Sequence, residues 1–379
     1  AFSIAGTNIV SASGFAYLNT LGKPLIQASF GICSSYFMVF FMAIMISNMD
    51  KLGITLAQAY GKKDYSRCRI IITQGAITTL LMFGLVSLPL MLNEENLLLL
   101  IGLPAENCRI AQQMANSLVP AMIVQCGAEF LKTVCFSQGH ESIFGRVNFF
   151  NVPLSLLLSY VFIIRWDMEI QGWVYSKLVF ELVNLCTGLY VFLCWSIPEV
   201  KGFVSLQETF SGLGHFVLDS VKFTLGTYSE FFGFEITSYF VAVTGNNDSI
   251  AAYTSFISVN TLLFIVGLSF ATICRTRLNL LMGMHLPNTA RNFFFFFVTC
   301  AAIVGLVVSV ALFSTRTILA EFFANSTERM KNDFFGLLSV YVFAAPSELS
   351  VATSMMGMKT LGRIIDVLKI AFIFYVLLN

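Results

Sequence analysis

The sequence predicts an all-α polytopic membrane protein made of two copies of one multi-span unit. Of its 379 residues, 57% are hydrophobic and 11% are charged, whereas about 25% of an ordinary soluble domain is charged. Long apolar runs recur along the whole chain, and turn glycines repeat at a fixed offset. This composition excludes a soluble enzyme, a disordered chain and a nucleic-acid-binding protein. The net charge of +1 gives no general attraction to polyanions.

The spans are located from runs of about 20 mostly apolar residues, the length that crosses the hydrocarbon core of a bilayer. Strands are excluded because a lipid-spanning strand alternates apolar and polar residues over about ten positions, whereas these runs are apolar on every side. About eleven spans follow, the first partial, near residues 1–18, 22–47, 68–92, 110–136, 143–165, 170–196, 216–243, 249–274, 291–315, 333–358 and 362–379. The chain lacks a starting methionine and ends inside an apolar run, so we expect both ends to be truncated.

The charges of the connecting loops indicate the orientation of the spans. The connections at 61–69, 275–291 and 359–369 are rich in lysine and arginine, and the alternate connections are acidic or neutral. Basic connections lie on the cytoplasmic side of a membrane. We therefore expect an integral, multi-pass protein with a cytoplasmic N-terminus, in the plasma membrane or an organelle membrane.

An internal repeat divides the chain. Pairs of turn residues recur with an offset of 222 or 223, namely Gly22 and Gly245, Gly61 and Gly283, Arg69 and Arg291, and Gly139 and Gly362. The repeat predicts an N-lobe at 1–197 with spans 1–6, a cytoplasmic linker at 198–215, and a C-lobe at 216–379 with spans 7–11. Because both copies start on the same side, they are parallel repeats. Transporters built this way hold substrate between the halves and rock them for alternating access.

Two pairs of opposite charges lie inside predicted spans, where an isolated charge costs several kcal/mol. Glu129 and Lys132 are three residues apart, and Lys177 and Glu181 are four apart. These spacings place both partners on one helix face and predict intrahelical ion pairs. The favoured interpretation is structural, with each pair neutralising itself in the bundle interior or near an interface.

The predicted seventh span carries two acids without a basic partner in that helix, Glu230 and Glu235. Five residues of helix turn through about 500°, so the two acids diverge by about 140°. Burial favours the protonated form of a carboxyl group, which lets it take up and release protons. The neighbouring Phe231, Phe234 and Tyr239 offer aromatic faces that suit a lipophilic cation. The alternative is that the aromatics face lipid and neighbouring hydroxyls cap the acids.

Glu348 follows Pro346 by two residues in another predicted span. A proline inside a span frees a backbone carbonyl and bends the helix, so an acid beside it is a candidate site for a ligand or proton. The alternative is a hydrated carboxylate near the outer half of the membrane.

The sequence contains no motif of a catalytic, metal or nucleotide site in a suitable context. None of the nine cysteines forms a Cys-x-x-Cys pair. We therefore expect a protein that is not an enzyme and uses no catalytic residue, cofactor or metal. Any transport must then draw its energy from an ion gradient.

Four segments together resemble the multidrug and toxic compound extrusion (MATE) transporters, eukaryotic branch. Gln58-Ala59-Tyr60-Gly61-Lys62 is similar to the family's loop after the second span, and the stretch from Glu230 to Glu235 resembles its acidic and aromatic segment in the seventh span. The stretch from Gly357 to Arg363 resembles the glycine-rich stretch after the tenth span, and Arg277 falls where the family has an arginine in the eighth. The motif residues are Gln58, Gly61, Arg277, Gly283 and Gly362.

The resemblance implies two pseudo-symmetric six-helix bundles, of which about eleven spans are present, the first partial and the twelfth missing. It implies export of organic cations or amphiphilic solutes in exchange for protons, with Glu230, Glu235 and Glu348 as the proton and cation site. The expected partners are the lipid bilayer, the solute and protons, without nucleic acid. The family's asparagine beside the Arg277 motif is displaced, because Leu280 stands there and Asn279 is adjacent.

Two alternatives follow from these departures. One is a degenerate carrier that serves as a structural subunit of a membrane complex, in which the acids bind partner helices. The other is a lipid or lipid-linked oligosaccharide flippase of the same superfamily. A flippase needs a cationic groove for phosphate, and the spans offer only Lys132 and Lys177, each beside an acid.

Overall fold

The computed structural model describes residues 24–202, 204–244, 247–323 and 328–361, together with a few single positions near both ends. Within the helices, the side chains of 229–251 and of several positions between 254 and 268 lie outside the description. All regular elements in the described ranges are helical, as the sequence predicts.

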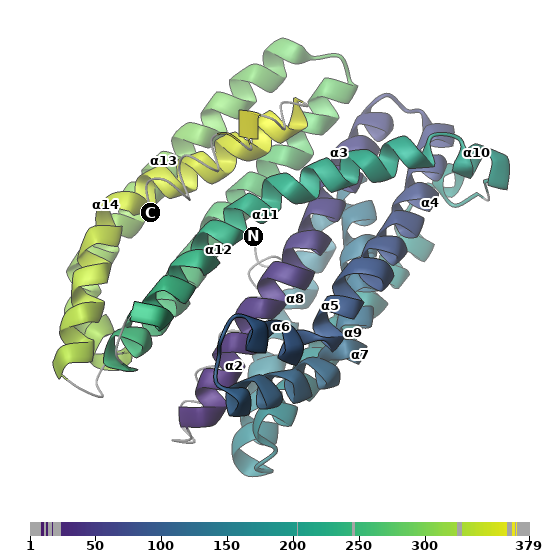
Figure 1. Cartoon of the computed structure of the whole chain (residues 1–379). Helices are drawn as coiled ribbons and strands as arrows, with labels where there is room; N and C mark the ends of the chain where they lie inside the picture. The colour runs from purple at the N-terminus through teal and green to yellow at the C-terminus, as the bar shows by residue number, and fades with distance from the viewer. Residues whose placement is uncertain are drawn as a thin grey trace. The chain divides into compact units, whose positions relative to one another are not determined.

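The first half of the described chain contains long helices that include π turns and are joined by short connections (Figure 1). The elements are α2 (Pro24–Phe37), η1 (Met38–Met42), α3 (Ala43–Gly61), α4 (Tyr65–Met82), η2 (Phe83–Ser87), α5 (Leu88–Leu92), α6 (Glu94–Leu100), α7 (Ala105–Ser137), α8 (Glu141–Tyr160), η3 (Val161–Arg165) and α9 (Glu169–Trp195). The π turns η1, η2 and η3 continue the helices that contain them, so α2, η1 and α3 form one uninterrupted helix.

The second half begins with two short helices and continues with four long ones. The elements are η4 (Pro198–Val200), α10 (Leu206–Phe210), α11 (Leu213–Thr244), α12 (Asn247–Gly283), α13 (Pro287–Phe323) and α14 (Glu328–Thr360). A capping box starts α10, because Ser205 accepts from the Glu208 backbone N–H at 3.2 Å and the Glu208 carboxylate accepts in return. Gly212 then turns the chain into α11 with φ of 86°, a left-handed conformation that favours glycine.

Seven of the described helices are long and apolar enough to cross a membrane. They are Ser29–Gly61, Tyr65–Leu92, Ala105–Ser137, Glu141–Arg165, Glu169–Trp195, Pro287–Glu321 and Glu328–Thr360. The predicted spans at 68–92, 110–136, 143–165, 291–315 and 333–358 lie within them, and the one at 170–196 ends one residue beyond Trp195. The predicted spans at 216–243 and 249–274 lie within α11 and α12. The predicted segments at 1–18 and 362–379 fall largely outside the described residues.

One predicted boundary is wrong. The span near 22–47 was expected to end before the charges of Asp50 and Lys51, but the helix continues to Gly61. These charges are tolerated because the protein covers them. Asp50 is 4% exposed, and Lys51 pairs with an acid from a distant helix.

The chain divides into two compact units, and the described parts of these units are 9–231 and the residues that follow 231. In the first unit, a large apolar core includes Phe30, Tyr36 and Phe41. In the second, α12, α13 and α14 pack around Phe334 and Leu338. The two-lobe division expected from the repeat, with its linker at 198–215, stays a prediction.

Large apolar side chains cover much of the outer surface. Leu85, Leu100, Phe150, Val310 and Phe343 are each more than 60% exposed. A water-soluble protein rarely exposes so many large apolar groups, whereas lipid tails accommodate them. The exposed apolar faces therefore agree with the helix lengths in indicating a bilayer environment.

Candidate functional site

Glu348 is a buried carboxyl group in the middle of α14. Its side chain is 5% exposed, so the alternative of a hydrated carboxylate does not describe it. The Tyr341 hydroxyl donates to Glu348 Oε2 at 2.6 Å. Seven residues correspond to about two helical turns, which places both side chains on one face of α14. Glu348 Oε1 has no hydrogen-bond partner within the described part of the chain.

Three helices of the second unit surround this carboxyl group. Phe256 of α12 meets the Tyr341 ring edge-on, with 5.5 Å between centroids. Gly305 of α13 allows α14 to approach closely, because a Cβ there would lie 2.6 Å from the Pro346 Cα. Among the described residues, no basic side chain lies within ion-pair distance of Glu348. An acid without a counter-charge in such surroundings is a strong indication of a functional site.

The other predicted binding residues lie on α11, whose backbone is helical from Leu213 to Thr244. The side chains of the predicted set are outside the described residues, and this set comprises Glu230, Glu235, Phe231, Phe234 and Tyr239. Their grouping with Glu348 therefore stays a prediction.

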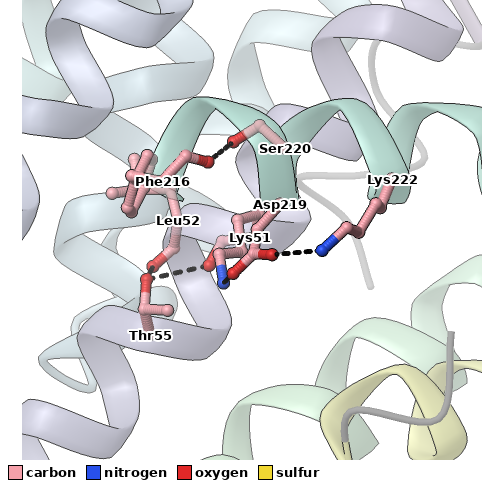
Figure 2. A network of polar contacts seen from close by, with 7 residues as sticks. All are labelled: Lys51, Leu52, Thr55, Phe216, Asp219, Ser220 and Lys222. Atoms are coloured by element: carbon pink, nitrogen blue, oxygen red, sulfur yellow. Dashed lines mark hydrogen bonds and ion pairs between the residues drawn. The ribbon is translucent and has the colours of Figure 1, made fainter. Parts of the chain in front are cut away.

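The preceding part of α11 is attached to α3 by polar contacts. Lys51 Nζ lies 3.2 Å from Asp219 Oδ2, and Ser47 Oγ lies 2.9 Å from Thr224 Oγ1. Lys222, one turn after Asp219, pairs with the other oxygen of this carboxylate at 3.1 Å (Figure 2). These contacts cross from one helix to another that is more than 160 positions further along the chain.

Aromatic rings surround the Lys51 ammonium. Its Nζ lies 5.8 Å from the centroid of Phe216 and 5.7 Å from that of Phe223. Both distances are within the range of a cation–π interaction. Position 230 follows Asp219 by 11 residues, or about three turns, so the two positions share a face of α11. The Lys51 contacts therefore anchor the beginning of the helix that carries the predicted acids.

The two intrahelical ion pairs predicted in the first half are confirmed. Lys132 of α7 bonds to Glu129, and Lys177 Nζ of α9 lies 3.9 Å from Glu181 Oε1. All four residues lie in the first unit, on helices that pack against each other.

Three of the motif residues, Gln58, Gly61 and Gly283, lie at the ends of described helices. Gln58 and Gly61 form the last turn of α3, where the Gln58 carbonyl accepts from the Lys62 backbone N–H at 3.2 Å. Gly283 is the last residue of α12, and Gly362 lies outside the described residues. Arg277 is exposed on α12.

Sequence reasoning missed a buried polar group near Arg277. Arg275 is 9% exposed and Asn279 is fully buried. The Asn279 amide donates to the Arg275 carbonyl at 2.8 Å and to Thr360 Oγ1 at 3.4 Å, which links α12 to the end of α14. The four-residue spacing of Arg275 and Asn279 was the available signal, whereas Thr360 is 81 residues away.

The helical fold of the described residues and their seven candidate spans define a polytopic membrane protein. A family model described as MatE matches residues 5–161. Multidrug and toxin extrusion protein 2 of Mus musculus is 21% identical over 280 residues, which are 72% of this chain and 47% of that protein. The match thus spans about half of that relative's length.

Solved structures of such transporters have the same fold. The eukaryotic MATE transporter AtDTX14 matches with a TM-score of 0.85 and 18% identity, over 99% of this chain and 85% of that one. The Vibrio cholerae MATE transporter VcmN in its bent form matches with a TM-score of 0.77 and 16% identity, over 99% and 85%. This chain therefore has the fold of these transporters, and its first part matches the MatE family model.

Proposed function

We propose that this protein exports small organic cations or amphiphilic solutes in exchange for protons, by alternating access. The observation that carries the proposal is Glu348, a carboxyl group that is buried in the second unit without a basic partner among the described residues. The ionised carboxylate attracts a cation, and the protonated form does not. Proton and cation therefore compete for one group, which is the requirement for exchange.

Tyr341 supports this role because its phenol hydroxyl can stay beside Glu348 in both the ionised and the protonated form of the carboxyl group. Its hydroxyl donates to Glu348 Oε2 and stabilises the ionised form. When Glu348 carries a proton, the same oxygen pair loses its charge and holds a cation less strongly. The reciprocal effect follows from linkage, since a bound cation lowers the affinity of the site for a proton by the same factor.

The contacts between α3 and α11 support alternating access. Since α3 ends at Gly61, before the basic connection at 61–69, the Lys51–Asp219 ion pair lies toward the predicted cytoplasmic side. A protein that opens to the cytoplasm must separate some contacts at this end. We infer that Lys51–Asp219 and Ser47–Thr224 are among them.

The experiment is cation efflux from proteoliposomes under an imposed pH gradient, with a fluorescent organic cation as the probe. We expect Glu348→Gln to abolish proton-driven efflux. Its effect on cation binding can be measured separately, where a loss of about 1.4 kcal/mol corresponds to about tenfold weaker binding. Tyr341→Phe should reduce efflux and keep its dependence on the gradient. Ser347→Ala is the matched control, because that neighbouring side chain is exposed and bonds only within its own helix.

Efflux by Glu348→Gln at the wild-type rate, with an unchanged response to the pH gradient, would reject the assignment. Thermal unfolding of each variant establishes that a loss of efflux does not come from a loss of folding.

A further inference from the structure

A second group of ionisable side chains lies inside the first unit, where α7 packs against α9. It consists of Glu129 and Lys132 on α7, and Lys177 and Glu181 on α9. The group contains two acids and two bases, so its net charge is zero when all four are ionised. If the four charges only neutralised each other, the group would be purely structural. The contacts of Glu181 indicate instead that this carboxyl group can bind a proton.

Glu181 lacks the contacts that stabilise a buried carboxylate. Its side chain is fully buried, and Lys177 is 1% exposed. The 3.9 Å between Lys177 Nζ and Glu181 Oε1 is too long for a hydrogen bond. Neither carboxylate oxygen of Glu181 has a hydrogen-bond partner of normal geometry within the described residues, although Asn184 approaches the same group. A charge in this position is costly, and a proton on Glu181 neutralises it.

Lys177 has an alternative partner when Glu181 is neutral. Its Nζ lies 5.1 Å from the ring centroid of Phe37 and 5.9 Å from that of Trp173. These rings stabilise the ammonium by cation–π interactions that do not depend on the carboxylate. The ring contacts therefore already exist beside the carboxylate, and they remain available to Lys177 when Glu181 is protonated.

Glu129 connects the buried acid with the outside of the bundle. Its side chain is 17% exposed, and that of its partner Lys132 is 11% exposed. The two pairs adjoin because α7 packs against α9, and the charge of Glu129 acts on both Lys177 and Glu181. A partly exposed carboxylate thus lies beside one that is fully buried.

The other groups around Glu181 do not replace it as a proton acceptor. On α7, the thiol of Cys126 and the ammonium of Lys132 interact electrostatically with it. From α8, the neighbouring contact is Asn151, an uncharged amide that donates to the Phe180 carbonyl at 3.1 Å. Lys177 is the ionisable neighbour on α9 itself. Among these groups, Glu181 is the buried acid.

We propose that Glu181 is a second proton-binding site, that Glu129 delivers the proton, and that Phe37 and Trp173 hold the Lys177 ammonium in place when the proton arrives. One proton from water reaches the Glu129 carboxylate and passes to the Glu181 carboxylate, which changes the net charge of the group from zero to +1. The proposal rests on the proposed function for its transport consequence, namely one additional proton for each exported cation.

The site is tested directly by infrared difference spectroscopy of the purified protein during a pH titration, which needs no transport. We expect a carboxylic-acid C=O band that disappears in Glu181→Gln. The double variant Lys177→Gln/Glu181→Gln should lose the same band without leaving an unpaired buried ammonium, which covers the case that the single variant does not fold. The matched control is Glu321→Gln, which changes a surface Lys–Glu pair with 3.8 Å between Lys331 and Glu321.

In proteoliposomes, the proton-to-cation ratio from reversal potentials should fall by one in Glu181→Gln and stay unchanged in Glu321→Gln. An unchanged infrared band in both Glu181 variants would overturn the site whether or not the protein transports. A lost band with an unchanged ratio would overturn its part in coupling. The absence of cation flux in the wild type would overturn the proposed function and its transport consequence, while the infrared result still decides the site.

Discussion

Lys51 and Asp219 form an ion pair of 3.2 Å although they are 168 residues apart. The pair joins α3, which ends in a basic connection, to the beginning of α11. Lys51 has a side-chain exposure of 13%, and Asp219 of 42%. The lysine therefore depends more on this contact than the aspartate does, because water compensates only the more exposed partner.

The first prediction concerns the energy of this contact. We expect Asp219→Asn to lower the free energy of unfolding by about 1 kcal/mol, at the upper end of partly exposed ion pairs, because it leaves Lys51 without its acid. A double-mutant cycle with Lys51→Gln should give a coupling of similar size. Lys222, which is 54% exposed, provides the comparison, and its cycle with Asp219 should give a coupling near zero. Equal couplings in the two cycles would contradict the special position of Lys51.

A second prediction follows from Glu94, which lies in α6, outside the seven described spans. Its side chain is fully buried and accepts from the Cys33 thiol at 3.6 Å. Burial raises the pKa of the Glu94 carboxyl to about 8, and the Cys33 contact lowers it by less. The folded state therefore binds the proton more tightly than the unfolded state.

Stability should fall as the pH rises, because the protonated form of Glu94 is the one that the folded state favours. The contribution of Glu94 to stability is fully present below the ordinary pKa of a glutamate and is lost as the pH rises through about 8. Within this window, stability should fall by up to about 1.4 kcal/mol per pH unit. Glu94→Gln should flatten the dependence, measured as thermal unfolding against pH. Glu95→Gln, at the next position, is the control and should keep the wild-type pH profile. An unchanged pH profile in Glu94→Gln would contradict the assigned role of Glu94.

The third prediction concerns the packing that surrounds Glu348. A Cβ at Gly305 would lie 2.6 Å from the Pro346 Cα, which is backbone and cannot turn aside. Gly305→Ala should therefore force α13 and α14 apart and cost about 1–3 kcal/mol, together with a loss of efflux. Gly336→Ala is the control, because no atom lies within 4 Å of a Cβ there and alanine favours the helix. Equal stability of the two variants would exclude a tight contact at Gly305.

The helices could be predicted from the sequence because their apolar runs are local and long. The intrahelical pairs could be predicted for the same reason, since Lys177 and Glu181 are four residues apart. The burial of Glu348 beside Pro346 also agrees with expectation. In each case the signal lies within one helix.

Features that depend on distant contacts could not be predicted in this way. The helix through Lys51 was expected to end early because its acidic partner belongs to α11. Glu94 was assigned to an acidic connection, since nothing nearby in the sequence shows that Cys33, 61 residues away, covers it. Arg275 and Asn279 were missed because Thr360 completes their group from α14.

The π turn at Met38–Met42 determines which side of α3 meets α11. A π turn inserts one residue into a helix, and each residue of an α-helix turns the next by about 100°. Deleting a single residue from this turn would leave the helix apolar and equally able to cross a bilayer. It would also rotate Ser47 and Lys51 by more than a quarter of a circle, away from Thr224 and Asp219. A one-residue deletion that leaves the hydropathy almost unchanged would thus be enough to break the polar contacts between α3 and α11.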